Sequence, residues 1–132
     1  MVHTVCYVSN KTEAVDQNGI QDIFATTQRN NHIRNITGIL LFLENSFLQV
    51  LEGERNEVAS LFTKIQNDNR HENIFVVIDK SIEKCTFKNY KSGFSFVKDA
   101  EDLNNLKNYL NTSSDSIKET ENILNILQPF LL

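Results

Sequence analysis

The chain has 132 residues, 40% of them hydrophobic and 23% charged, which fits one globular domain with a real core. The net charge of -4 and the pI near 5.3 argue against a nucleic-acid-binding surface, which is usually basic. The chain shows no signal peptide and no apolar run long enough to cross a bilayer. Its two cysteines, Cys6 and Cys85, form no metal or redox motif. We therefore expect a cytoplasmic protein with reduced thiols.

The first half of the chain predicts a strand, a helix and a hairpin. Residues 2–8 alternate and are rich in Val, Cys and Tyr, which indicates a strand. After a polar Asn-Lys-Thr-Glu loop, apolar residues at helical spacing predict a helix over about residues 18–31. Residues 36–43 form a second apolar strand, and the turn Glu44-Asn45-Ser46 leads into a third strand, residues 47–53.

The second half predicts a helix over about residues 56–67, a strand at 74–78 and a strand at 90–97. The order is β-α-β-β-α-β-β, and its first six elements match the ferredoxin-like arrangement. We therefore expect an α+β fold with both helices on one face of the sheet. The first and third strands are then central neighbours, which places Tyr7 beside Gln49.

The C-terminal part of the chain is helical in pattern. Residues 102–110 predict a short helix, residues 111–115 a polar break with good N-cap residues, and residues from 117 a final helix that Pro129 ends. We expect these C-terminal helices to cover the free face of the sheet. The expected division is a core at residues 1–97 and a helical cap or output segment at residues 98–132.

The third strand carries a glutamine between apolar residues. Both of its faces are apolar, which is typical of a central strand, so Gln49 is buried and must find hydrogen-bond partners or cost about 1–3 kcal/mol. The inner face of the first helix aims Thr27, Asn30 and Asn31 toward Tyr7 and Gln49. A few polar groups in an apolar cleft suit a planar heterocycle, and side-chain amides suit a ring with adjacent carbonyl and N–H groups, such as a flavin.

Each of these residues also has an ordinary structural interpretation. A strand tyrosine often only packs, Asn30-Asn31 at a helix end can form a C-cap, and a lone strand glutamine can face solvent. Taken singly, these interpretations are favoured. Taken together, five such residues on facing surfaces support a ligand site as strongly as the structural alternatives do.

Several motifs occur along the chain at a specific spacing. They are Tyr-x-Ser at 7–9, Gln-Arg-Asn-Asn at 28–31, Ile-Thr-Gly-Ile-Leu-Leu at 36–41, Phe-Leu-Gln-Val-Leu-Glu-Gly at 47–53 and Asp-x-Arg-His at 68–71. This pattern resembles the BLUF domain, a flavin-binding blue-light sensor, over roughly residues 2–96. The resemblance runs without a gap from Tyr7 to His71.

The resemblance implies a photochemical function and no enzymatic one. By position, Gln49 matches the glutamine that bridges the flavin N5/C4-carbonyl edge and the tyrosine hydroxyl, Tyr7 matches the electron donor, and Asn31 matches the asparagine bonded to the flavin C4 carbonyl and N3. Light drives an electron and, through Gln49, a proton away from Tyr7, and recombination leaves Gln49 rotated or tautomerised. The change is a hydrogen-bond rearrangement of about 1 kcal/mol per bond, so the lit state should revert in the dark.

The resemblance also extends the binding site and implies its cofactor. Asn30 and Thr27 occupy neighbouring polar positions, and Asp68, Arg70 and His71 match residues that contact the flavin ring or its phosphate-bearing tail. Without the resemblance, a charged helix end would explain Arg70 and His71 equally well. The implied cofactor is FAD, with FMN or riboflavin as alternatives.

The fifth strand departs from the family pattern. Tyr90 stands where the family usually has tryptophan, and Ser92 stands where it usually has methionine. These positions are thought to relay the glutamine change to the sheet and the C-terminal helices, so we assign the signal relay to Tyr90 and Ser92. We expect altered dark recovery, which the recovery rate of a Ser92→Met variant would test.

Other functions fit parts of the sequence. A small acyl-phosphate hydrolase on the same scaffold needs a glycine-rich anion loop with an arginine after the first strand, and the Asn-Lys-Thr-Glu loop has neither. A BLUF-like flavin-binding or protein-interaction module that has lost photochemistry is the alternative that the altered fifth strand keeps open. The resemblance implies a short stand-alone photoreceptor that signals to a downstream protein or assembles as a homo-oligomer (a dimer or higher), with no nucleic-acid or membrane partner.

Overall fold

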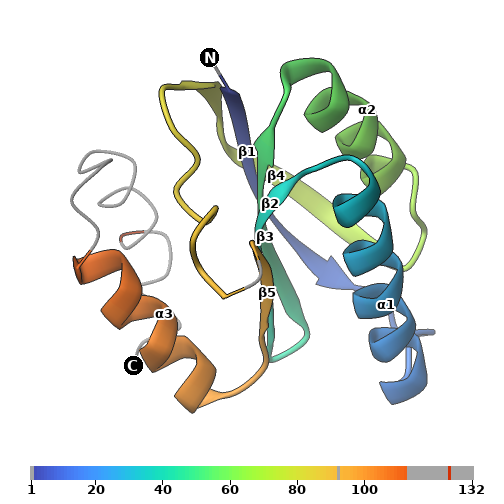
Figure 1. Cartoon of the computed structure of the whole chain (residues 1–132). Helices are drawn as coiled ribbons and strands as arrows, with labels where there is room; N and C mark the ends of the chain where they lie inside the picture. Colours follow the sequence, from blue (N-terminus) through green and yellow to red (C-terminus); the bar gives the residue numbers. More distant parts are fainter. Residues whose placement is uncertain (1, 92, 113–124, 126–132) are drawn as a thin grey trace.

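The computed structural model describes residues 2–91, 93–112 and 125, and its strands form one five-stranded sheet (Figure 1). Helices α1 and α2 lie on one face of this sheet and α3 lies on the other (Figure 1). The expected α+β class and the ferredoxin-like order of the first six elements are confirmed. In chain order the elements are β1 (Val2–Lys11), α1 (Gln17–Ile33), β2 (Thr37–Leu43), β3 (Ser46–Gly53), α2 (Arg55–Gln66), β4 (His71–Ile82), β5 (Phe94–Val97) and α3 (Ala100–Thr112).

The sheet order is β4-β1-β3-β2-β5, so β1 and β3 are central neighbours as the sequence predicts. They pair antiparallel, and the register sets Tyr7 opposite Gln49. On its other side Gln49 lies opposite Leu40 of β2. β3 is buried from Phe47 to its end, and Gln49 is 2% exposed. The interpretation of Gln49 as a solvent-facing residue is therefore wrong.

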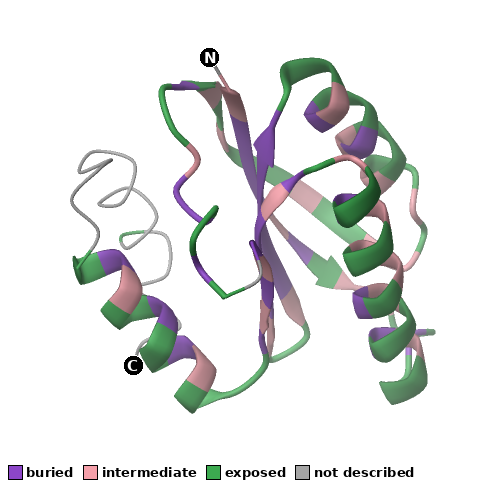
Figure 2. Cartoon of the chain, in the orientation of Figure 1, coloured by how far each residue is buried: buried purple, intermediate pink, exposed green. Residues whose placement is uncertain are grey.

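Each face of the sheet has its own apolar core, because side chains alternate along every strand. Buried residues follow the sheet on both sides (Figure 2). Each fully buried aliphatic or aromatic side chain contributes about 1.5–3 kcal/mol of apolar transfer free energy. The core under α3 contains Cys6, Ile39, Leu41, Leu48, Val50, Phe87, Tyr90, Val97, Leu103, Leu106 and Leu110. The cores under α1 and α2 contain Val5, Val15, Ile20, Phe24, Ile36, Leu40, Phe47, Leu51, Val58 and Leu61.

Helix α1 is long enough to carry both asparagines inside it. It begins after Asp16, whose carboxylate accepts a hydrogen bond from the Gly19 N–H at 2.9 Å, as an N-cap should. It ends at Ile33, with Arg34 as C-cap. Asn30 and Asn31 therefore lie in the last helical turn, and the interpretation of this pair as a C-cap is wrong.

The predicted fifth strand begins too early. The sequence predicts a strand over residues 90–97, but β5 covers only Phe94–Val97. Lys91 and Gly93 have φ values of 53° and 93°, in the left-handed region, which a strand cannot accommodate. The Gly93 N–H instead donates to the Tyr90 carbonyl in a turn. Tyr90 thus belongs to the β4–β5 connection (residues 83–93), and Ser92 lies outside the described residues.

The fourth strand is longer than predicted, because the polar residues on both sides of positions 74–78 also pair with β1. The predicted helix over 102–110 is confirmed as α3, and the predicted final helix lies outside the described residues except for residue 125. Within the described part of the chain, no helix combines the length and the hydropathy that a membrane span requires.

Candidate functional site

A cavity lies between α1, α2 and the face of the sheet that carries Tyr7 and Gln49. Its space free of atoms is about 580 Å³, including the part open to solvent. All of the residues that the sequence predicts for the site line it, namely Tyr7, Thr27, Asn30, Asn31, Gln49, Asp68, Arg70 and His71.

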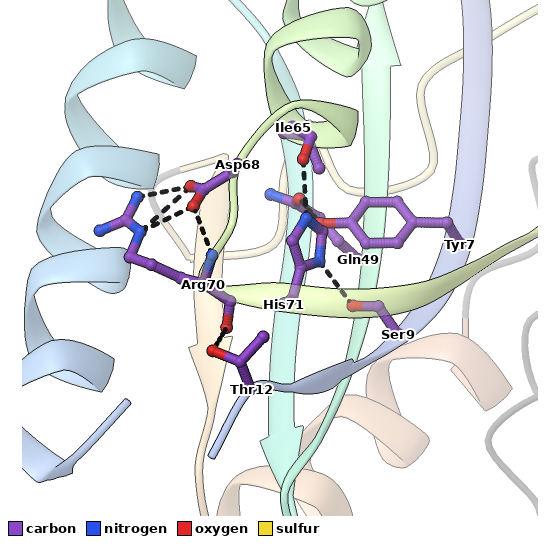
Figure 3. A network of polar contacts seen from close by, with 8 residues as sticks. All are labelled: Tyr7, Ser9, Thr12, Gln49, Ile65, Asp68, Arg70 and His71. Carbon is purple, nitrogen blue, oxygen red and sulfur yellow. Dashed lines mark hydrogen bonds and ion pairs between the residues drawn. The ribbon is translucent and has the colours of Figure 1, made fainter. Parts of the chain in front are cut away.

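Tyr7 and Gln49 are joined across the two central strands. The Tyr7 hydroxyl donates to Gln49 Oε1 at 2.6 Å, and both residues are buried (Figure 3). Gln49 Nε2 has no partner within the described residues. A buried donor without an acceptor costs about 1–3 kcal/mol, so this amide suits a ligand that offers an acceptor.

Asn31 presents a second unpaired amide to the cavity. The residue is 1% exposed, and neither Oδ1 nor Nδ2 has a hydrogen-bond partner in the described part of the chain. One free acceptor beside one free donor matches a ring edge on which a carbonyl and an N–H are neighbours. Together with Gln49 Nε2, these orphaned atoms fit the pyrimidine-like edge of a flavin.

His71 is held in one orientation by two contacts (Figure 3). Its Nε2 lies 2.7 Å from the carbonyl oxygen of Ile65, and its Nδ1 lies 2.8 Å from the Ser9 hydroxyl. A carbonyl only accepts, so Nε2 carries the proton, and in the neutral ring Ser9 donates to Nδ1. Both ring nitrogens are engaged inside the protein, so His71 offers the cavity a ring surface and no free N–H.

Asp68 and Arg70 form an ion pair at the edge of the cavity (Figure 3). Arg70 Nη2 lies 2.6 Å from Asp68 Oδ2, and Arg70 Nε lies 3.0 Å from Oδ1. This hydrogen bonding from the Arg70 side chain is the main reason that the pKa of Asp68 is lowered. Because both side chains are about 30% exposed, the pair is partly screened by water.

Burial keeps Tyr7 in its neutral form. Loss of hydration raises the pKa of the Tyr7 hydroxyl far above its ordinary value, and the negative charge of Asp68 adds to the rise. The hydroxyl therefore keeps the proton that it donates to Gln49. Burial likewise raises the pKa of Cys6 to about 12, and Cys6 and Cys85 are both free thiols.

Several lining residues were missed by the sequence analysis. Lys64 of α2 lies one turn after Leu61 on the same helical face, and this spacing could have identified it. The apolar walls had no individual signal, because such residues look the same in any core. The missed residues are Ile23, Thr26, Leu40, Phe47, Leu61, Lys64 and Ile65.

Tyr90, the predicted relay residue, does not line the cavity. It packs on the opposite face of the sheet, with ring centroids 6.4 Å from Phe87 and 4.6 Å from Tyr109 of α3. A direct contact between Tyr90 and Gln49 is therefore excluded.

The fold and the cavity define a small α+β domain with a cavity that suits a planar heterocyclic ligand. The BLUF family model, whose description is sensors of blue-light using FAD, matches residues 2–93. The chain belongs to the BLUF family and is a blue-light sensor domain that uses a flavin.

Curated relatives match the chain over a small part of their own length. Photoactivated adenylate cyclase subunit beta of Euglena longa is 34% identical over 74 residues, which are 56% of this chain and 9% of that protein. The blue light- and temperature-regulated antirepressor BluF of Escherichia coli (strain K12) is also 34% identical over 74 residues, again 56% of this chain and 18% of that protein.

Solved structures share the fold over most of the chain. The ground state of BlsA is 31% identical with a TM-score of 0.67, and the alignment covers 87% of this chain and 75% of that one. A bacterial light-regulated adenylyl cyclase is 29% identical with a TM-score of 0.69, over 98% of this chain and 35% of that one. The BLUF domain of BlrP1 has a TM-score of 0.78 at 23% identity, over 99% of this chain and 90% of that one, which shows the fold alone.

Proposed function

We propose that Tyr7 and Gln49 are the photoactive pair of this sensor and that Asn31 and Gln49 hold the flavin. The observation that carries this proposal is the hydrogen bond of 2.6 Å from Tyr7 to Gln49 beside three buried amide atoms that lack partners in the described part of the chain. Those amide atoms are costly in the protein alone and are satisfied by a ligand with matching groups.

The remaining lining residues suit the other parts of the cofactor. Thr27 and Asn30 add polar contacts along α1, and the apolar walls suit a planar ring. Lys64 lines the cavity beside the ion pair of Asp68 and Arg70, and its positive charge favours a phosphate-bearing tail. This charge supports FAD or FMN over riboflavin, and the family description, which names FAD, supports FAD before FMN.

The chain's own residues would perform the proton steps. When bound, an oxidised flavin supplies blue-light absorption and an electron acceptor. Tyr7 is the electron donor, and its hydroxyl proton moves along the 2.6 Å hydrogen bond to Gln49 Oε1. Electron and proton then return to Tyr7, and Gln49 is left rotated or tautomerised. A carboxamide can do this because it both accepts and donates, which glutamate or leucine cannot.

The signal would leave through the C-terminal part of the chain. We assign the sensor to residues 1–97 and the output segment to residues 98–132, with α3 seated on the face of the sheet opposite the cavity. The chain would act as a sensor without catalysis of its own and signal to a partner protein or a second copy of itself. The free thiols of Cys6 and Cys85 support a cytoplasmic location.

A light-minus-dark absorbance spectrum of the purified protein tests the proposal. We expect a yellow protein with a small red shift under blue light that reverses in the dark, and chromatography of the released cofactor identifies the flavin. Full flavin occupancy without any shift would contradict the photoactive pair. It would favour a photochemically inert flavin-binding or interaction module, which the remote position of Tyr90 keeps open.

A further inference from the structure

Glu52 is a buried carboxylate on the same strand as Gln49. It is 1% exposed and points to the opposite face of the sheet, toward α3. Its oxygens accept hydrogen bonds from the backbone N–H groups of Thr86 at 2.5 Å and Phe87 at 2.9 Å, and from the Thr37 hydroxyl at 3.1 Å. None of the ion pairs in the described residues includes Glu52.

The three donors around Glu52 suit a carboxylate. Burying an acidic group is costly, and only donors that satisfy its oxygens make that burial tolerable. Both oxygens of Glu52 accept, one from each of two consecutive backbone amides. A glutamine of the same shape would turn a donor toward one of these amides and lose that bond. Glu52 thus anchors the β4–β5 connection to the centre of the sheet.

The same connection is bound to α3 on its other side. The Thr86 carbonyl accepts a hydrogen bond of 2.6 Å from the Tyr109 hydroxyl of α3. Phe87 is fully buried, and its ring stacks with that of Tyr109 at a centroid distance of 6.3 Å. The connection lies between the sheet and α3 (Figure 1). Glu52, Thr86 and Tyr109 therefore form a continuous polar path from β3 to α3.

We propose that Glu52 is a positioning residue that couples β3 to α3 through Thr86 and Tyr109. Gln49 and Glu52 lie three positions apart on a fully buried central strand, so a displacement at Gln49 is carried along β3 rather than absorbed by a loop. This path from Glu52 through Thr86 to Tyr109 does not include positions 90 and 92, to which the sequence analysis assigned the signal relay. Its light dependence rests on the proposed function of Tyr7 and Gln49, whereas the anchoring of the connection does not.

A Glu52→Gln variant tests the path by site-resolved hydrogen exchange in dark and lit samples. Glu52 does not line the cavity, so the red shift should keep its wild-type size. Exchange of the Thr86 or Phe87 amide should be about tenfold faster in the dark, because one of the two loses its acceptor. The difference in exchange of α3 between light and dark should fall to about half or less of its wild-type size.

Two further variants make the result specific. Glu83→Gln removes an exposed carboxylate from the same connection and should leave all three readouts unchanged. Tyr109→Phe removes a single hydroxyl and should reproduce the reduced α3 response, which keeps the test valid if Glu52→Gln folds poorly. A wild-type light response of α3 in folded Glu52→Gln or Tyr109→Phe would overturn the coupling. A wild-type protein without any red shift would overturn the photoactive pair instead, and the dark exchange of Thr86 and Phe87 would still decide the anchoring.

Discussion

The hydrogen bond between Tyr7 and Gln49 fixes which end of the amide meets the cavity. Gln49 Oε1 accepts from Tyr7, so Nε2 remains a donor without a partner among the described residues. The register of β1 and β3 alone brings the two side chains together, since they are 42 residues apart in sequence. A rotation of the Gln49 side chain is then enough to change which hydrogen-bonding group the cavity wall presents.

Tyr7→Phe tests this pair directly. The ring contacts with Phe62 at 5.5 Å and His71 at 6.0 Å remain, so flavin binding should survive. The reversible red shift should disappear, and stability should drop by about 1–3 kcal/mol because Gln49 Oε1 loses its donor. Absorbance spectra and urea unfolding measure both effects. Tyr90→Phe, on the other face of the sheet, should keep the shift; a shift of normal size in Tyr7→Phe would contradict the assignment.

Asn31→Leu should change stability in opposite directions with and without flavin. In the flavin-free protein the side-chain amide has no partner among the residues that the structure describes, so an apolar side chain of similar size should stabilise the fold or leave it unchanged. With flavin present the variant should bind about ten to a hundredfold more weakly, since two hydrogen bonds of about 1 kcal/mol each are lost. Unfolding curves of wild type and Asn31→Leu, measured without flavin and at the same flavin concentration, separate these two effects. If Asn31→Leu were destabilised equally with and without flavin, Asn31 would have a purely structural role.

At the scale of elements, β2 must approach β3 very closely. Gly38 has a φ of 147°, and a Cβ added there would overlap the carbonyl oxygen of Val50 on β3. Gly38→Ala should therefore cost about 3 kcal/mol or more, and it should weaken flavin binding because Leu40 lines the cavity from β2. Gly19→Ala, where the new Cβ would meet the Val15 side chain at 2.9 Å and no backbone atom, should change stability much less than Gly38→Ala, by about 1 kcal/mol. Thermal unfolding compares Gly38→Ala with Gly19→Ala. Equal losses of stability in the two variants would contradict the close approach of β2 to β3 at Gly38.

The elements show how far the sequence alone could lead. The alternation of apolar residues determined β3 and the helices well, because burial on a known period leaves a clear pattern. The start of β5 was missed, since the left-handed conformations of Lys91 and Gly93 leave no trace in hydropathy. Among the site residues, Tyr7 and Gln49 followed from the topology. The partners of Glu52 did not, because they come from a connection whose path no local pattern encodes.

At the scale of the whole molecule, the central sheet separates the face that carries the cavity from the face that carries α3. Gln49 projects into the cavity between α1 and α2, whereas Glu52 projects toward the connection and α3. One strand thus carries a buried polar group to each side. Both Gln49 and Glu52 are buried. Because a buried charge is costly, the protonation state of Glu52 affects the free energy of unfolding of the whole domain.

The pH dependence of unfolding should reveal Glu52. Burial raises the pKa of this carboxyl despite the hydrogen bonds from Phe87, Thr86 and Thr37, which act to lower it. The folded state then holds the proton at pH values where the unfolded chain has released it. Stability should fall as pH rises from the ordinary carboxyl range through the raised pKa, by about 1.4 kcal/mol for each pH unit that separates the two pKa values.

Asp68 contributes with the opposite sign, which makes a control possible. Its pKa is lowered, so its contribution is present above the ordinary carboxyl pKa and is lost as pH falls through the lowered one. Urea unfolding of flavin-free protein across the acidic to neutral range should show the decline toward neutral pH in wild type and in Asp68→Asn, and a flatter profile in Glu52→Gln. At the acidic end, where the Glu52 carboxyl is protonated and carries a donor as glutamine does, the stabilities of wild type and Glu52→Gln should differ least. Parallel profiles for wild type and Glu52→Gln would mean that Glu52 titrates as it does in the unfolded chain, and burial would then not control its charge.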